Sequence, residues 1–221
     1  GTKTALVGES GSGKSTIIKL ILGLNSNYSG NIKYDNFNID SIPTREMAKI
    51  TTLITNDSYL VKGTVREHLS VRKNITEEEM YNALEKVNLR DFVEEHGGLD
   101  YELVIGAANL SGGQKQRLLA AKAILKDSYL YILDEAVSNI DDYSKEIVLN
   151  AFDSIKEGKI IIVISHDLET VTNADNIYVL KDKKIIEEGT HDELIEENSL
   201  YRKLFTDQQQ LKSKFLAKEV E

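Results

Sequence analysis

The stretch Gly8-Glu9-Ser10-Gly11-Ser12-Gly13-Lys14-Ser15 decides the fold, because it fits the pattern G-x-x-x-x-G-K-[ST]. The apolar run before it, residues 4–7, predicts a buried strand, and residues 16–22 after it predict a helix. The glycines allow a tight loop whose backbone N–H groups point inward at an anion. The helix that follows adds the positive end of its dipole. Between a strand and a helix, the pattern predicts a phosphate-binding loop rather than a glycine-rich turn before an ordinary helix.

Two side chains of this loop carry charge chemistry. We expect the Lys14 ammonium to lie between the β- and γ-phosphates of a nucleotide, and the Ser15 hydroxyl to ligate Mg²⁺. The other residues expected to line the phosphates are Gly8, Glu9, Ser10, Gly11, Ser12, Gly13 and Thr16.

Composition excludes several classes of protein. The 221 residues are 41% hydrophobic and 29% charged, as in ordinary globular proteins, and the net charge is −9. There is no basic stripe of the kind that nucleic-acid-binding domains carry, so we expect no nucleic-acid partner. Cysteine is absent, which excludes disulfides and thiolate metal sites. No apolar run reaches 18 residues, so no membrane-spanning helix is predicted.

Apolar runs alternate with helical patterns along the rest of the chain. Residues 129–133 and 160–164 are continuous apolar runs, which suit parallel strands covered on both faces, and a helix is predicted between them over 142–156. The pattern therefore predicts an α/β fold with a mostly parallel core sheet and a small antiparallel part. Other predicted strands are 31–35, 50–55, 177–180 and 184–187, with a hairpin return over 35–39, and predicted helices include 116–125, one capped by Thr190, and 200–220.

Residues 64–126 differ in character and read as an inserted helical subdomain. Thr64 begins a capped helix, and residues 76–79 resemble a capping box followed by apolar residues on one helical face. We expect 102–105 to be loop. The alternative is that these helices simply cross over the sheet, but a segment of about 60 residues is much longer than ordinary crossovers. The predicted division is a core of 1–63 and 127–221, with 64–126 as the subdomain.

Two further stretches carry candidate chemistry. Asp134 and Glu135 end an apolar strand, where α/β sheets bind ligands, so Asp134 is placed to hold Mg²⁺ and Glu135 to activate water. Alone, such a pair is more often a helix cap. Residues 110–114, Leu-Ser-Gly-Gly-Gln, precede a helix and predict a second anion site, with a plain Ser-capped helix as the alternative.

Together these motifs resemble the ATP-binding cassette (ABC) ATPases, P-loop NTPases that form the nucleotide-binding domains of ABC transporters. The resemblance covers nearly the whole chain. It implies that residues 8–15 are the Walker A motif, 110–114 the signature motif, 133–135 Walker B with its catalytic glutamate, 138–141 the D-loop and His166 the switch histidine. It implies ATP and Mg²⁺ as ligands. It also implies that two such domains pack head to tail, so that Ser111, Gly112, Gly113 and Gln114 of one, together with Asp141, serve the nucleotide held by Lys14 of the other.

Residues 62–69, 188–194 and 201–204 are similar to those of exporter-type members. The resemblance therefore implies a transmembrane domain, usually in the same polypeptide, and a place on the cytoplasmic face of the membrane. Three departures stand out. Asn56 occupies the position of the Q-loop glutamine, expected at the Mg²⁺ and the attacking water; residues 105–109 lack the glutamate that exporters commonly carry; and no adenine-stacking aromatic precedes Gly8. From the last we expect an N-terminally truncated cassette that lacks its first strands.

Two other functions remain open at this point. One is a soluble ABC ATPase without a transport role, although such proteins usually carry tandem cassettes or long coiled-coil insertions, and neither is visible here. The other is a degenerate cassette that binds ATP for regulation and scarcely hydrolyses it. Glu135 and His166 argue against the degenerate cassette, whereas Asn56 argues for it.

Overall fold

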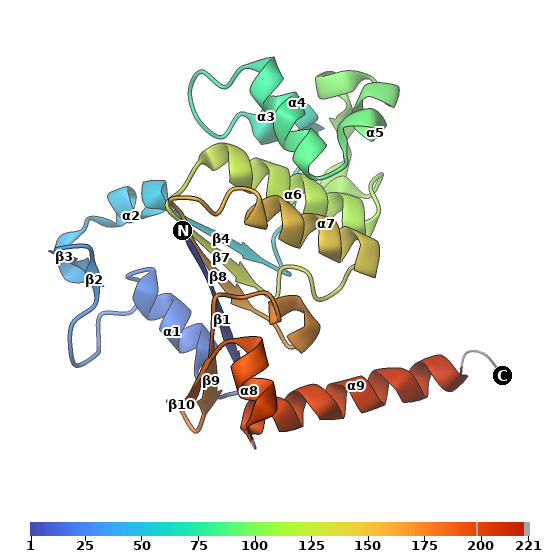
Figure 1. Ribbon diagram of the computed structural model, residues 1–221. Helices are drawn as coiled ribbons and strands as arrows, with labels where there is room; N and C mark the ends of the chain where they lie inside the picture. The colour runs from blue at the N-terminus through green and yellow to red at the C-terminus, as the bar shows by residue number, and fades with distance from the viewer. Residues whose placement is uncertain (198, 219–221) are drawn as a thin grey trace. The chain divides into compact units, whose positions relative to one another are not determined.

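The computed structural model describes residues 1–197 and 199–218 and forms two compact units (Figure 1). The first, here called the loop unit, contains Thr2–Pro43 and Ile162–Glu221. The second, the central unit, contains Gly1 and Thr44–Ile161. Strand β8 (Ile160–Ile164) begins in the central unit and ends in the loop unit. In the described residues, no helix is long and apolar enough to cross a membrane.

The loop unit is built on three strands. β1 (Thr2–Gly8) pairs in parallel with β9 (Asn176–Lys181), and β9 pairs antiparallel with β10 (Lys184–Gly189), so the predicted final hairpin is confirmed. Ala5 and Val7 of β1 and Ile177 and Val179 of β9 are fully buried, which explains why β1 reads as a continuous apolar run. The remaining elements are α1 (Lys14–Ile21), β2 (Lys33–Tyr34), β3 (Phe37–Asn38), the 3₁₀ turns η1 (Ile39–Ser41) and η4 (Leu168–Val171), α8 (His191–Glu196) and α9 (Leu200–Lys218).

The central unit pairs β4 (Thr51–Thr55) in parallel with β7 (Leu130–Asp134), in a register that sets Thr55 opposite Asp134. Helix α6 (Gly112–Lys126) contacts β4 and lies beside α7 (Asp142–Asp153) and α4 (Glu77–Lys86). Short elements complete the unit: α2 (Thr44–Ile50), β5 (Gly63–Thr64), α3 (Val65–Leu69), α5 (Arg90–Glu95), the 3₁₀ turns η2 (Gly98–Asp100) and η3 (Ile105–Ala107), and β6 (Glu102–Leu103). The parallel pairs β1–β9 and β4–β7 confirm the predicted α/β class.

Local sequence signals predicted the starts of α3 and α4, whereas the helix expected over 116–125 begins earlier, as α6 (Gly112–Lys126). Thr64 and Thr76 are the N-caps of α3 and α4, and each forms a full capping box with the glutamate three residues later. The apolar residues Met80 and Leu84 of α4 are buried, as the helical spacing indicates. The assignment of 64–126 to an inserted subdomain stays a prediction.

Several predicted boundaries were wrong. Residues 102–105 were expected to be loop, but Glu102–Leu103 forms β6, because the edge of β5 offers it backbone partners. Ile50 ends helix α2, which was not predicted, and the strand starts one residue later. The helix expected to reach 156 stops at Asp153, and the strand expected over 31–35 is reduced to Lys33–Tyr34. The helix expected over 200–220 runs to Lys218, and residues 219–220 lie outside the described part of the chain.

Candidate functional site

The phosphate-binding loop follows β1 with a backbone that its glycines make possible. Gly8, Gly11 and Gly13 have φ angles of 147°, 80° and 110°, in the region that side chains disfavour. Gly13 is the N-cap of α1 and its carbonyl accepts from the N–H of Thr16 at 3.0 Å. A strand, a loop with left-handed glycines and a helix N-terminus therefore follow one another, as predicted for an anion site.

Lys14 folds back over its own loop. Its Nζ donates to the carbonyl oxygens of Gly8 at 2.7 Å and Glu9 at 3.0 Å, and the side chain is buried. Two neutral carbonyl oxygens thus hold the ammonium at the loop. A phosphate oxygen carries negative charge and would bind the ammonium more strongly than either carbonyl. Ser15 and Thr16 are exposed at the start of α1, so their hydroxyls are accessible to a ligand.

The β9–β10 hairpin borders the loop on its other side. A Cβ at Gly8 would lie 2.3 Å from the carbonyl oxygen of Leu180, so the close packing of β1 on β9 requires glycine there. The loop and hairpin enclose a cavity of about 380 Å³ lined by Glu9, Ser10, Gly11, Ser12, Leu180, Lys181, Asp182, Lys183 and Leu200. The hydroxyl oxygen of Ser12 is buried without a hydrogen-bond partner, which fits a loop built to receive a further polar group.

His166 lies in the same unit, one residue after the buried Ser165 that follows β8. Its side chain is exposed. The Ser165 hydroxyl accepts from the N–H of Asp167 at 3.0 Å, and Asp167 in turn caps η4. The turn therefore presents the imidazole at the end of a strand, where the sequence placed it.

In the central unit, the predicted residues lie at the ends of two neighbouring strands. Thr55 and Asp134 are opposite each other at the ends of β4 and β7, so Asn56 and Glu135 each take the next position along adjacent strands. Asn56 is exposed, whereas Asp134 and Glu135 are half-buried. The structure thus brings together the two carboxylates and the amide that the sequence assigned to metal and water.

Glu135 has an unusual backbone. Its φ is +54°, in the left-handed region that few residues other than glycine, asparagine and aspartate adopt. The turn is held by Ser138, whose backbone N–H and hydroxyl both donate to the Glu135 carbonyl, at 3.1 and 2.9 Å. Strained conformations of this kind persist where surrounding structure fixes them, and they cluster at functional sites. The left-handed conformation of Glu135 turns the chain directly after β7 ends at Asp134.

The second predicted anion site is a capped helix start. Ser111 is the N-cap of α6, and its hydroxyl accepts from the N–H of Gln114 at 3.1 Å. The Gln114 side chain returns the bond by accepting from the N–H of Ser111 at 2.8 Å. Ser111 and Gly112 are exposed, and Gly113 is buried against the start of α7. The structure therefore confirms the alternative of a Ser-capped helix, and the second anion site stays a prediction.

Asp141 lies beside this helix start. It is the N-cap of α7 and accepts from the N–H of Ser144 at 2.8 Å. Hydrogen bonds from the backbone and side chain of Ser144 lower the pKa of Asp141. A Cβ at Gly113 would lie 2.6 Å from an Asp141 carboxylate oxygen, so the structure brings the predicted signature and D-loop residues together.

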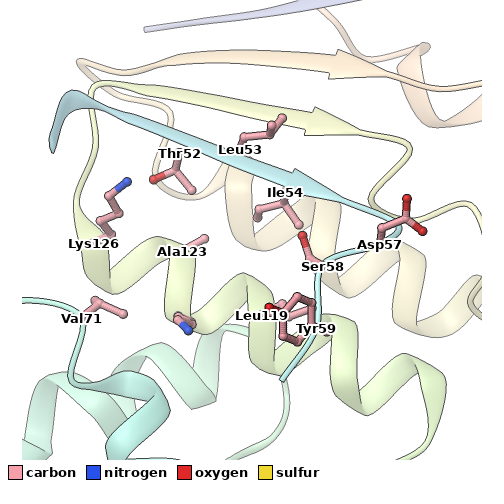
Figure 2. A pocket seen from close by; sticks show the side chains of 11 residues that line it. Thr52, Leu53, Ile54, Asp57, Ser58, Tyr59, Val71, Leu119, Ala123 and Lys126 are labelled. Atoms are coloured by element: carbon pink, nitrogen blue, oxygen red, sulfur yellow. The ribbon is translucent and has the colours of Figure 1, made fainter. Parts of the chain in front are cut away.

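A separate cavity of about 390 Å³ opens between β4 and α6 (Figure 2). None of the predicted site residues lines it, although Asp57 and Ser58 follow Asn56 directly. Tyr59 and Leu53 expose apolar surface there. Its lining residues are Thr52, Leu53, Ile54, Asp57, Ser58, Tyr59, Val71, Leu119, Lys122, Ala123 and Lys126.

Comparison with known proteins identifies the family. The family model described as ABC transporter matches residues 1–138, which include the phosphate loop, residues 110–114 and the strand-end carboxylates. The chain belongs to the ABC transporter family. This ABC chain is 44% identical over 209 residues to an uncharacterized ABC transporter ATP-binding protein of Haemophilus influenzae, covering 94% of the chain and 37% of the relative.

Two further relatives are named as a flippase and as an exporter. The chain is 37% identical over 206 residues to the ATP-dependent lipid A-core flippase of Neisseria meningitidis, covering 92% of the chain and 33% of the flippase. A bacterial Atm1-family ABC exporter, solved with ATP bound, superposes with a TM-score of 0.86 at 28% identity, covering 94% of this chain and 37% of that one. The chain spans about a third of the length of these relatives. It is an ABC ATPase domain.

Proposed function

We propose that this ABC domain binds ATP with Mg²⁺, hydrolyses it to ADP and phosphate, and powers the export of a substrate that the sequence does not name. The observation that carries the proposal is the phosphate loop, in which left-handed glycines, a helix N-terminus and the Lys14 ammonium converge. The relatives named as a flippase and an exporter support the transport role over a soluble ABC ATPase.

The residues of the site have distinct proposed roles. Residues 8–16 hold the phosphates through backbone N–H groups and Lys14. Glu135 orients the attacking water and accepts its proton, Asn56 contacts the same water, and His166 contacts the γ-phosphate. These roles come from the resemblance, and the positions of Asn56, Asp134 and Glu135 at adjacent strand ends support them.

Mg²⁺ fits the donors that the chain offers. The loop unit offers the exposed hydroxyl of Ser15, and the central unit offers the half-buried carboxylate of Asp134 with the Asn56 amide at the neighbouring strand end. Mg²⁺ takes hard oxygen ligands and usually binds through one or two side chains together with phosphates and water. When bound, it neutralises charge that develops on the phosphates.

A second ABC domain is the first proposed partner. The capped start of α6, with exposed Ser111 and Gly112, is available to the nucleotide of another domain in a head-to-tail pair. Gly113 and Asp141 lie behind it and fix its position. In a two-fold dimer residue i of one copy meets residue j of the other and the reverse, so each copy completes the other's site and two composite sites form.

A transmembrane domain is the second proposed partner, which would place this domain at the cytoplasmic face of a membrane. The cavity between β4 and α6 (Figure 2) is a reasonable contact surface, because exposed apolar side chains such as Tyr59 border it. Its lining residues Ile54 and Asp57 lie on either side of Asn56 in the chain, so movement there would reach the proposed water-binding amide.

The test is ATP turnover by the intact protein, wild type and Glu135→Gln, with Mg²⁺ and with a chelator. Glutamine keeps the size of the side chain and removes the proton acceptor, so turnover should fall on the order of 10²–10⁴-fold while ATP still binds. Chelation should abolish wild-type turnover. Turnover near wild type in Glu135→Gln would overturn the assignment of Glu135, and slow wild-type turnover with normal binding would favour a degenerate regulatory cassette.

A further inference from the structure

The C-terminal helix α9, red in Figure 1, is hydrogen-bonded to the backbone of the segment that carries His166. The Gln208 amide makes both contacts. Its Nε2 donates to the carbonyl oxygen of His166 at 2.6 Å, and its Oε1 accepts from the N–H of Leu168 at 3.0 Å. One side chain therefore satisfies an acceptor and a donor on either side of Asp167, as a paired strand would.

Two neighbours on α9 extend this contact. Gln209 donates to a carboxylate oxygen of Glu169 at 2.6 Å. Lys212, one helical turn after Gln208, contacts the carboxylates of both Asp167 and Glu169. These hydrogen bonds lower the pKa of Glu169, with Lys212 as the first cause. Since the ion pairs are partly exposed they contribute little stability, so the backbone contact of Gln208 is the specific one.

The start of α9 is fixed independently. The Glu187 carboxylate of β10 accepts from the N–H groups of Leu200 at 2.6 Å and Tyr201 at 3.0 Å. The Tyr201 ring is fully buried and its hydroxyl lies 2.8 Å from Nδ1 of His191. The helix is thus anchored to the hairpin that borders the phosphate loop, and Gln208 reaches the histidine segment from a fixed support.

We propose that Gln208 is a positioning residue for His166, and that α9 thereby sets how readily the histidine reaches the γ-phosphate. The proposal rests on the proposed function, in which His166 makes that contact. Ser165 is buried and fixes the segment on one side, and Gln208 fixes the backbone on the other. The exposed imidazole between them can then take only the directions that this backbone allows.

The first measurement is steady-state ATP turnover of the intact protein carrying Gln208→Met. Methionine keeps an unbranched side chain of similar length and a high helix propensity, and it removes both hydrogen bonds. We expect kcat to fall roughly 10- to 100-fold, since small misplacements of a reacting group cost up to about 100-fold. The KM for ATP should change little, because the phosphate loop is untouched. Gln210→Met, at an exposed site on the same helix, is the matched control and should match wild type.

The second measurement is an NMR pH titration of the imidazoles. If Gln208 only supports the fold, the His166 signal should be unchanged in Gln208→Met. The chain has four histidines, and His166→Gln assigns the relevant signal by its loss. In Gln208→Met the His166 signal should shift, while those of His68 and His96 stay in place. An unmoved His166 signal, or a kcat within about twofold of wild type, overturns the positioning role.

The His166→Gln variant separates the two proposals. If it turns over ATP like wild type, the assigned role of His166 fails, and the proposed function must be revised at that residue. If it is inactive while Gln208→Met is normal, only the positioning role fails. A general loss of folding in Gln208→Met, with all four histidine signals altered, also counts against a specific positioning role.

Discussion

Gly113 and Ser144 lie so close that a Cβ on Gly113 would come within 2.1 Å of the Ser144 hydroxyl oxygen and 2.8 Å of its Cβ. The N-terminal ends of α6 and α7 therefore meet where one side chain is missing. Its neighbour Gly112 has no atom within 4 Å of such a Cβ. The two adjacent glycines of the signature motif thus have different physical reasons to be glycine.

We expect Gly113→Ala to destabilise the protein and Gly112→Ala to leave it as stable or slightly more so. Overpacking at Gly113 should cost about 1–3 kcal/mol, whereas alanine at an unstrained helical position can add roughly 0.4–1 kcal/mol. Urea unfolding of both variants, compared with wild type, measures the difference. Equal effects at the two positions would contradict the packing argument.

The signals that the sequence carried were local ones. The phosphate loop was predictable because its glycine pattern, with Gly13-Lys14 between a strand and a helix, lies within one short stretch. The helix starts at Thr64 and Thr76 were predictable because a capping box lies within four residues. The Ser-capped helix start at Ser111, given as the alternative to a second anion site, was recognisable for the same reason.

The features that the sequence missed depend on contacts between distant segments. Strand β6 forms only because β5, about 40 residues earlier, offers it an edge. Ser138 fixes the left-handed backbone of Glu135 through a turn, and no residue type in that turn predicts this conformation. Gln208 contacts a segment 40 and 42 residues away, and nothing in a polar helix distinguishes it from Gln210 beforehand.

Asn56 offers a test of how closely the site is tuned. The pairing of Thr55 with Asp134 sets Asn56 at the end of β4, next to the strand that leads to Glu135. Its amide is one methylene shorter than glutamine, so it should reach Mg²⁺ poorly or through water. We therefore expect Asn56→Gln to raise ATP turnover or leave it unchanged. A loss of more than about tenfold would mean that the site is adjusted to asparagine.

His68 should make the stability of the fold depend on pH. Its ring is 5% exposed and Nε2 lies 3.0 Å from the carbonyl oxygen of Val61. Burial is the main cause that lowers the pKa of His68 below 6.5, with nearby Lys122 acting in the same direction. Because the unfolded chain takes up the proton more readily, the contribution of His68 is fully present above pH 6.5 and is lost as the pH falls through its lower folded value.

Unfolding midpoints in urea between pH 7.5 and 5 test this. The midpoint should drop with pH in wild type, and the drop should be smaller in His68→Gln, where no proton is taken up. The exposed His96 provides the control, and His96→Gln should keep the wild-type slope. A slope that His68→Gln leaves unaltered would assign the acid sensitivity to other groups.

The head-to-tail pairing can be tested by complementation, because Ser111 and Lys14 would serve the same nucleotide from different chains. Ser111→Arg fills the exposed start of α6 with a large side chain and should abolish ATP turnover while leaving ATP binding by the separate chain intact. Lys14→Ala removes the ammonium that Gly8 and Glu9 hold at the loop and should abolish turnover by weakening phosphate binding. Mixed in equal amounts, the two variants should recover about a quarter of the wild-type sites, since half of randomly paired dimers are mixed and each mixed dimer keeps one intact composite site.

Ser213→Arg, at an exposed serine on α9, controls for the added charge and should retain turnover. Recovery of turnover on mixing requires that the two residues act across an interface. If Ser111→Arg instead abolishes ATP binding by the separate chain, the α6 start serves its own nucleotide and the pairing is wrong.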